Sequence, residues 1–139
     1  LAAMVAATEP GGWVLIEDFD WATALMVDPP SATHDKMVGA IRELFSRHGY
    51  SSTYGRTLPR TLAGAGLLDI GTRAQAIQVS ADRAAGVPQW ELLADQFAPA
   101  LLGAGLVTEA DLDAFHALWH DGRTICFSPL MVSCWGKRR

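Results

Sequence analysis

Short apolar segments that alternate with helical stretches constrain the fold of this chain more than any other feature. The clearest segment, 13–16, is continuously apolar and follows the turn Pro10-Gly11-Gly12, which a helix cannot continue through. Strands are predicted at 13–16, 69–78 and 124–135. Helices are predicted at 1–8, 33–48 and 57–65, and the stretch 80–122 is predicted to be mainly helical. This order predicts an α/β fold, in which helices cover a sheet.

Proline residues interrupt two of the predicted elements. Pro129 lies inside the last strand and predicts a bulge or an irregular edge there, because proline cannot donate a hydrogen bond to the strand ladder. Pro99 lies within the helical stretch and is expected to kink or split a helix. Both residues therefore mark points where the simple pattern should break.

Composition limits the class of protein and its partners. Half of the 139 residues are apolar and 19% are charged, which is typical of a globular domain. The net charge of −4 argues against nucleic acid and against an anionic membrane as the main partner. No window of about 20 residues is continuously apolar, and no secretory signal is recognisable. Cys126 and Cys134 lack a CxxC spacing, which indicates reduced core residues of a cytoplasmic protein.

Three segments together resemble class I S-adenosylmethionine-dependent methyltransferases, especially the actinobacterial small-molecule enzymes. Glu9 to Asp18 resembles the Pro-Gly-Gly turn and fifth strand of that family, Gly55 to Ile70 its next helix and sixth strand, and Ser128 to Arg138 its closing seventh strand. The resemblance implies that 1–139 is a single partial domain, the C-terminal half of a Rossmann-like fold. Strands five to seven would then pair as neighbours, with the last strand antiparallel between the other two. The helical stretch 80–122 would be an insertion that forms a lid or part of the pocket wall.

The same resemblance implies S-adenosylmethionine as the methyl donor and a small-molecule acceptor. However, the glycine-rich loop that follows the family's first strand has no counterpart here. Gly64-Ala65-Gly66 and Gly103-Ala104-Gly105 end helices rather than open them. The sequence also begins with Leu1, which indicates either an unusual start codon or a piece of a longer chain. Cofactor-binding residues therefore stay unassigned, and we expect the chain alone not to bind S-adenosylmethionine measurably.

Three carboxylates are the candidate catalytic residues. Glu17, Asp18 and Asp20 directly follow the predicted strand 13–16, and ligands of open α/β sheets bind outside the carboxyl ends of strands. By resemblance, this position faces the acceptor and the methyl group. At least one of the three is expected to orient or deprotonate the acceptor, helped by a pKa that burial raises. The alternative is that they cap a helix and solvate a loop.

Candidate substrate-binding residues come from nearby in the sequence. Phe19, Trp21 and Tyr54 could form the wall of a pocket, because aromatic rings give rigid apolar contact, although packing in the core is the alternative. Arg56 could hold an acidic group of the substrate. Its alternative role is to pair with a carboxylate of the protein or to cap a helix.

Two histidines on one predicted helix complete the candidates. His116 is a candidate substrate-binding residue and base, contributed by the helical insertion. His116 and His120 are spaced as metal ligands can be, but no third ligand is recognisable, so no metal site is expected.

Other classes of function stay open. Without its cofactor-binding half, the chain could be an inactive remnant or an interaction module. The strand 13–17 would then expose an apolar edge that is open to self-association or to a partner. A free-standing helical binding domain with a small sheet is a further alternative.

Overall fold

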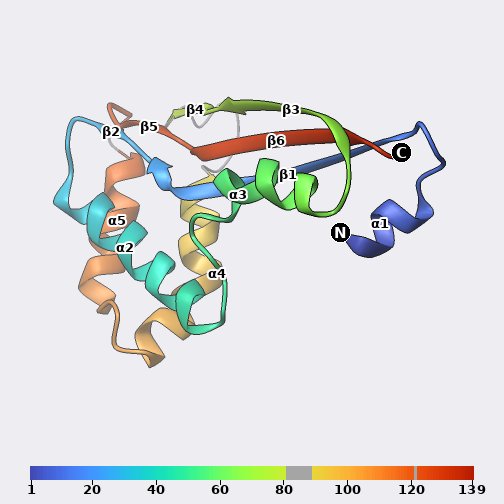
Figure 1. Ribbon diagram of the computed structural model, residues 1–139. Helices are drawn as coiled ribbons and strands as arrows, with labels where there is room; N and C mark the ends of the chain where they lie inside the picture. The colour runs from blue at the N-terminus through green and yellow to red at the C-terminus, as the bar shows by residue number, and fades with distance from the viewer. Residues whose placement is uncertain (81–88, 121) are drawn as a thin grey trace. The chain divides into compact units, whose positions relative to one another are not determined.

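The chain divides into two compact units. The computed structural model describes residues 1–80, 89–120 and 122–139 (Figure 1). The first unit contains 1–23, 52–76 and 129–139, and the second contains 24–51 and 77–128. Each unit has its own sheet, so the fold is mixed α/β with mostly antiparallel strands.

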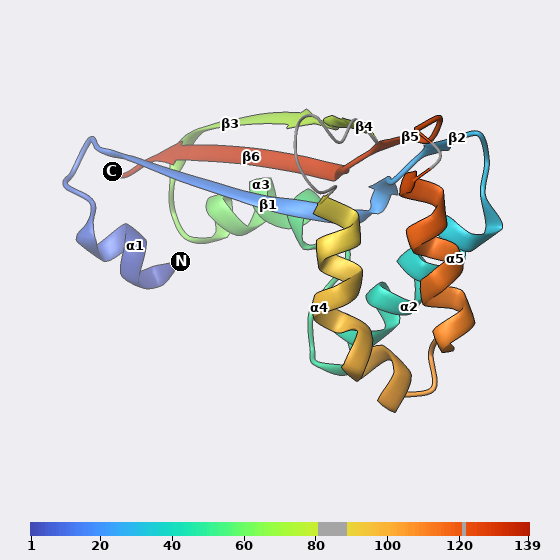
Figure 2. The same cartoon turned by 180° about the vertical axis from the view of Figure 1, so that it is seen from behind.

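A three-stranded sheet forms the centre of the first unit. Its strands are β1 (Trp13–Ala24), β3 (Leu68–Gln75) and β6 (Pro129–Lys137). The order is β1-β6-β3, so the last strand of the chain lies in the middle (Figure 2). β6 pairs antiparallel with β3, and Thr72 lies opposite Cys134. The expected antiparallel arrangement of the last strand is therefore present.

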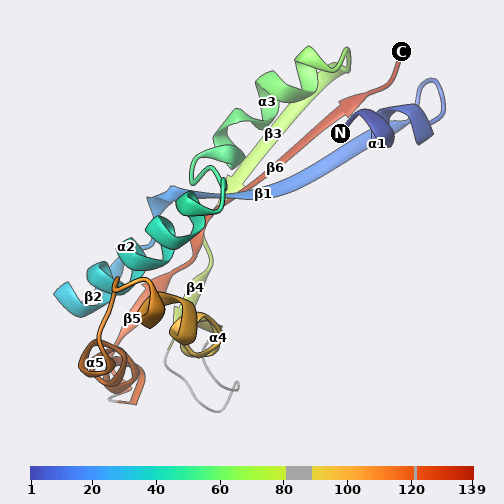
Figure 3. The ribbon, with the colours of Figure 1, turned by 90° about the horizontal axis from the view of Figure 1, so that it is seen from below.

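Helices α1 (Ala2–Ala7) and α3 (Tyr54–Gly64) cover one face of this sheet. α3 runs beside β3 and β6 in Figure 3 and contacts both strands. The core beneath it consists of Val14, Leu58, Leu62, Leu67, Val132 and Cys134. Burial of these apolar side chains is the main force that holds the helix on the sheet.

Strand β1 is much longer than the sequence pattern predicts. The predicted strand ended at Ile16, but β1 continues to Ala24. The carboxylates of Glu17, Asp18 and Asp20 therefore lie within the strand and not beyond its end. The expectation that they follow the strand is wrong. For Asp20, a long-range ion pair with Arg56 compensates the charge that is buried in the strand.

The final predicted strand, 124–135, is two strands. β5 (Ile125–Phe127) belongs to the second unit, and β6 begins at Pro129. Ser128 between them donates its N–H to the carbonyl of Ile77 (2.8 Å), and its hydroxyl accepts from the Ile77 N–H (3.0 Å). The irregularity predicted at Pro129 is thus a change from one sheet to another.

The second unit combines a small sheet with three helices. Its strands, in the order β2-β5-β4, are β2 (Val27–Asp28), β5 and β4 (Gln78–Ser80). Its helices α2 (Ala32–Arg47), α4 (Gln89–Gly103) and α5 (Glu109–His120) contact one another. The fully buried side chains include Met37, Ile41, Leu101, Phe115 and Trp119. The predicted helical stretch 80–122 thus contains α4 and α5, while 81–88 and 121 lie outside the described residues.

Polar contacts fix the start of α5. The Thr108 N–H donates to Asp111 (2.8 Å), and the Asp111 N–H donates to the Thr108 hydroxyl (3.3 Å), which is a reciprocal cap. Lys36 of α2 donates to both carboxylate oxygens of Asp111 at 2.7 Å. α4 continues through Pro99 without ending, so of the two predicted outcomes, a kink or a split, the split does not occur. Among the described residues, no helix has the length and apolar character needed to cross a membrane.

Candidate functional site

The three predicted catalytic carboxylates do not form one cluster. Successive side chains of a strand point to opposite faces of its sheet, so Glu17 lies on one face and its neighbour Asp18 on the other. Glu17 is exposed and accepts a hydrogen bond from the Ser133 hydroxyl. Asp20 is only 2% exposed. Glu17 and Asp20 therefore have different environments and different chemistry.

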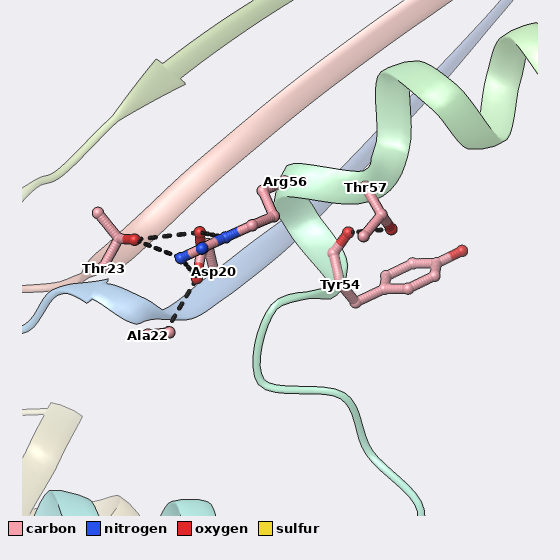
Figure 4. A network of polar contacts seen from close by, with 6 residues as sticks. All are labelled: Asp20, Ala22, Thr23, Tyr54, Arg56 and Thr57. Carbon is pink, nitrogen blue, oxygen red and sulfur yellow. Dashed lines mark hydrogen bonds and ion pairs between the residues drawn. The ribbon is translucent and has the colours of Figure 1, made fainter.

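Asp20 is the centre of a network of polar contacts in the first unit (Figure 4). Arg56 donates from Nε to Asp20 Oδ2 at 2.6 Å and from Nη2 to Asp20 Oδ1 at 3.0 Å, which is a bidentate pair. The Thr23 hydroxyl donates to Asp20 Oδ2 (3.1 Å), and the Ala22 N–H donates to Oδ1 (3.0 Å). All of the carboxylate's neighbours in this network are hydrogen-bond donors, as a buried anion requires.

A close approach between α3 and β1 brings Arg56 to Asp20. A Cβ atom on Gly55 would lie only 2.8 Å from the Asp18 carbonyl oxygen and 2.9 Å from the Asp20 nitrogen. Glycine is therefore needed where the first turn of α3 crosses the strand backbone. The Trp21 N–H also donates to the carbonyl of Ser52 at 2.8 Å, just before the helix. These contacts hold the second half of β1 against the start of α3.

The network determines the charge of Asp20. Burial alone would raise its pKa, but the hydrogen bonds from Arg56, Ala22 and Thr23 outweigh burial, and the pKa is lowered from 3.8. The bond with Asp20 in turn raises the pKa of Arg56. The expectation of a raised carboxylate pKa is thus wrong for Asp20, which is ionised at neutral pH. A carboxylate of this kind is poorly suited to accept a proton as a general base.

Arg56 takes its alternative role, because it pairs with a carboxylate of the protein. Its side chain is nevertheless 51% exposed, and its Nη2 also donates to the Thr23 hydroxyl at 2.8 Å. Asp20 therefore holds one side of the guanidinium while the other remains open to solvent. This arrangement can present a fixed cation to a polar or acidic group. Thr23 was not predicted from the sequence, since a lone threonine gives no signal.

The aromatic candidates fall into two kinds. Phe19 and Trp21 contact each other edge to face, with ring centroids 6.2 Å apart. Trp21 is 8% exposed, which agrees with the core-packing alternative for this residue. Tyr54, at the start of α3, keeps 36% of its surface exposed. Of these three rings, Tyr54 is the most available to a ligand.

His116 belongs to the second unit. Its Nδ1 lies 3.4 Å from Glu91 Oε1, and its Nε2 lies 3.1 Å from Asp95 Oδ1. His120 Nε2 also lies 3.4 Å from Glu91 Oε1. The carboxylate of Glu91, which is nearly buried, therefore lies close to both histidines. Glu91 and Asp95 on α4 are four residues apart, as are His116 and His120 on α5. This matched spacing is visible in the sequence and could have identified the two carboxylates as candidates.

The surroundings of the two histidines are open. They line a shallow hollow together with Asp113 and Ala117. Within 1–80, 89–120 and 122–139, no three His, Cys, Asp or Glu side chains have an arrangement that could hold a metal ion. The described geometry therefore offers charge pairing and acid–base groups at this hollow.

The predicted site residues thus separate by unit. Asp20, Arg56 and Tyr54 lie around the first turn of α3, whereas His116 lies on α5 of the second unit. No protein-family model matches the sequence, and no curated protein matches it significantly. Function is therefore inferred from the residues and from their arrangement.

Proposed function

We propose that this chain is the substrate-side half of a class I S-adenosylmethionine-dependent methyltransferase that acts on a small-molecule acceptor. The observation that carries the proposal is the strand order β1-β6-β3, with β6 in the middle and antiparallel to β3. The sequence resemblance implies this same order. Strands that follow one another in the chain usually lie beside one another in a sheet. A sheet in which the last strand lies between the two earlier strands is therefore less common.

The uncovered face of the first sheet supports the same proposal. α1 and α3 cover one face, and none of the described elements of the first unit covers the other. Trp13 and Leu15 on that face are each 55% exposed. Sheets of doubly wound proteins carry helices on both faces. A further layer of helices from a cofactor-binding half would bury these side chains.

Two glycine segments of the described residues differ from a nucleoside-binding loop. Gly66 and Gly105 have φ values of +80° and +66° and follow the ends of α3 and α4. They act as helix-terminating residues and not as a loop that opens a helix around a nucleoside. The proposal therefore assigns the cofactor to the other half of the enzyme.

This chain would supply the positioning of the acceptor. Arg56, held by Asp20, would contact a polar or acidic group of the acceptor. The ring of Tyr54 points away from the guanidinium in Figure 4 and would contact a different part of the acceptor. Asp18, which lies on the same face of β1 as Asp20, would orient the group that receives the methyl, because accurate positioning is a large part of catalysis in such a displacement.

Calorimetry with S-adenosylmethionine tests the proposal. We expect no measurable heat with the 139-residue chain and micromolar binding with the full-length gene product. In that product, Arg56→Met should weaken acceptor binding and leave cofactor binding unchanged. The matched control Arg60→Met, on the exposed side of α3, should change neither. Absence of cofactor binding by the full-length product would refute the proposal.

A second candidate function is an interaction module without catalysis. The uncovered apolar face and the position of β1 at the edge of its sheet favour it. In this case the native protein would bind a macromolecular partner and no S-adenosylmethionine. The calorimetric comparison distinguishes the two functions.

A further inference from the structure

The uncovered face of the first sheet has an ordered arrangement of side chains. Trp13, Leu15, Glu17, Ser133 and Trp135 line a shallow apolar groove on it. Glycine makes this surface flat, because a Cβ atom on Gly71 would lie 2.3 Å from atoms of the Trp135 indole. The indole therefore rests directly on the backbone of β3. The result is a platform of aromatic and aliphatic groups at the middle of the face.

A row of polar residues crosses the sheet beside this platform. Ser133 of β6 donates to Glu17 of β1. On its other side Ser133 pairs in register with Arg73 of β3. Residues directly opposite each other in an antiparallel pair project from the same face. The row thus has an exposed carboxylate at one edge of the face and an exposed guanidinium at the other.

These charges are self-complementary under a two-fold axis. A two-fold rotation about an axis parallel to β6 places β1 of one copy over β3 of the other. The rotation does not shift residues along the strands, so each row of one copy faces the same row of the other. Glu17 then faces Arg73 of the second copy, and Arg73 faces Glu17 of the second copy. Leu15 faces the Trp135 platform by the same operation. Two opposite charges at the ends of one polar row, beside an apolar platform, are the pattern expected of an interface that uses one patch twice.

We propose that the 139-residue chain forms a two-fold symmetric dimer in which the uncovered faces of the first sheets pack together. Packed sheets lie about 10 Å apart, which leaves room for the side chains of both faces to interdigitate. The inference goes beyond the proposed function, since it concerns the chain alone and does not depend on methyl transfer. A cofactor-binding half that covers the same face would compete with the second copy.

The size of the face sets the expected strength. Three strands at about 4.8 Å spacing and a central strand of nine residues give a face of roughly 14 by 30 Å. Such a face, about 420 Å² on each copy, has the size of a weak, transient interface, so the dimer should dissociate on dilution. The ion pairs should also make association weaker at high salt.

Analytical ultracentrifugation of charge-exchange variants tests the dimer. Wild-type protein should approach twice 14.9 kDa as concentration rises. Glu17→Arg and Arg73→Glu each place like charges opposite one another, so each should raise the dimer dissociation constant by about tenfold or more. The double variant E17R/R73E restores opposite charges and should return to within about threefold of wild type. Arg60→Glu changes the same charge on α3 and should have no effect.

Circular dichroism of each variant checks that the fold is kept. The double variant controls for any loss of folding or stability that the single substitutions cause by themselves. A wild-type protein that stays monomeric at every concentration would overturn the proposal. So would a dimer that both single variants leave intact, because another surface would then form it. Failure of the double variant to recover, with its fold intact, would also overturn it.

Discussion

Replacement of Gly55 by alanine should loosen the contact that brings Arg56 to Asp20. The new methyl group would lie 2.8 Å from the Asp18 carbonyl oxygen and 2.8 Å from the Phe19 carbonyl carbon. Non-bonded carbon atoms prefer about 3.5 Å or more, so helix and strand must separate by at least about 0.7 Å. These neighbours are backbone atoms, which cannot rotate away. Overpacking of this kind costs roughly 1–3 kcal/mol.

A second glycine of the same helix provides the matched control. Nothing lies within 4 Å of a Cβ on Gly64, at the other end of α3. Both substitutions gain helix propensity, worth up to about 1 kcal/mol. Their difference therefore isolates the clash, and Gly55→Ala should unfold at a free energy roughly 1–3 kcal/mol below Gly64→Ala.

Urea unfolding followed by circular dichroism measures this difference. The slope of the transition should be the same for both variants, since neither changes the surface exposed on unfolding. Equal stability of Gly55→Ala and Gly64→Ala would refute the reasoning, because it would mean that α3 does not touch β1 at this point.

Two further predictions concern titrating groups. Arg56→Met should raise the pKa of Asp20, because the effect of burial then outweighs the hydrogen bonds from the remaining donors. NMR of the carboxyl group measures this pKa. An unchanged pKa would mean that the ion pair does not control this carboxylate. In the wild type, the stability contributed by ionised Asp20 is present above pH 3.8 and is lost as pH falls through the lower folded pKa. Arg56→Met should not show this acid-dependent loss of stability. His34 is 1% exposed, its Nε2 has no hydrogen-bond partner among the described residues, and burial lowers its pKa despite Asp35. The contribution of neutral His34 to stability should therefore be fully present above pH 6.5 and be lost as pH falls through the lower folded pKa. His34→Leu should flatten this part of the plot of urea midpoint against pH. Identical plots for variant and wild type would contradict the prediction.

Much of the fold follows from local patterns in the sequence. The apolar stripe that includes Met37, Ile41 and Leu44 places α2 within one residue of its observed ends, and all three side chains are buried. The Pro-Gly-Gly turn correctly separates α1 from β1. These features depend on residues close in the chain, where periodicity and turn chemistry are informative.

The features that were missed depend on distant residues. Asp18 and Asp20 disfavour a strand locally, so the pattern ended β1 too early. In the structure, Arg56, 36 residues away, supplies the donors that allow Asp20 to be buried in the strand. A tertiary interaction of this kind leaves no periodic signal.

The candidate site shows the same limit. The sequence identified Asp20 and Arg56 as functional candidates. It did not predict that these two residues bind each other. The helix pattern predicted α3 from Thr57, whereas the helix begins at Tyr54, because Gly55 allows the chain to lie on the β1 backbone. The division of the last predicted strand at Ser128 likewise depends on its bonds to Ile77, 51 residues away.

The intact mass of the endogenous protein in its native cell tests the methyltransferase proposal best. If the chain is the substrate-side half of such an enzyme, the native product should have a mass near twice 14.9 kDa under denaturing conditions. Cross-linking with labelled S-adenosylmethionine should then mark the same species. A native product of 14.9 kDa that takes up no label, in the presence of its cellular partners, would contradict the proposal.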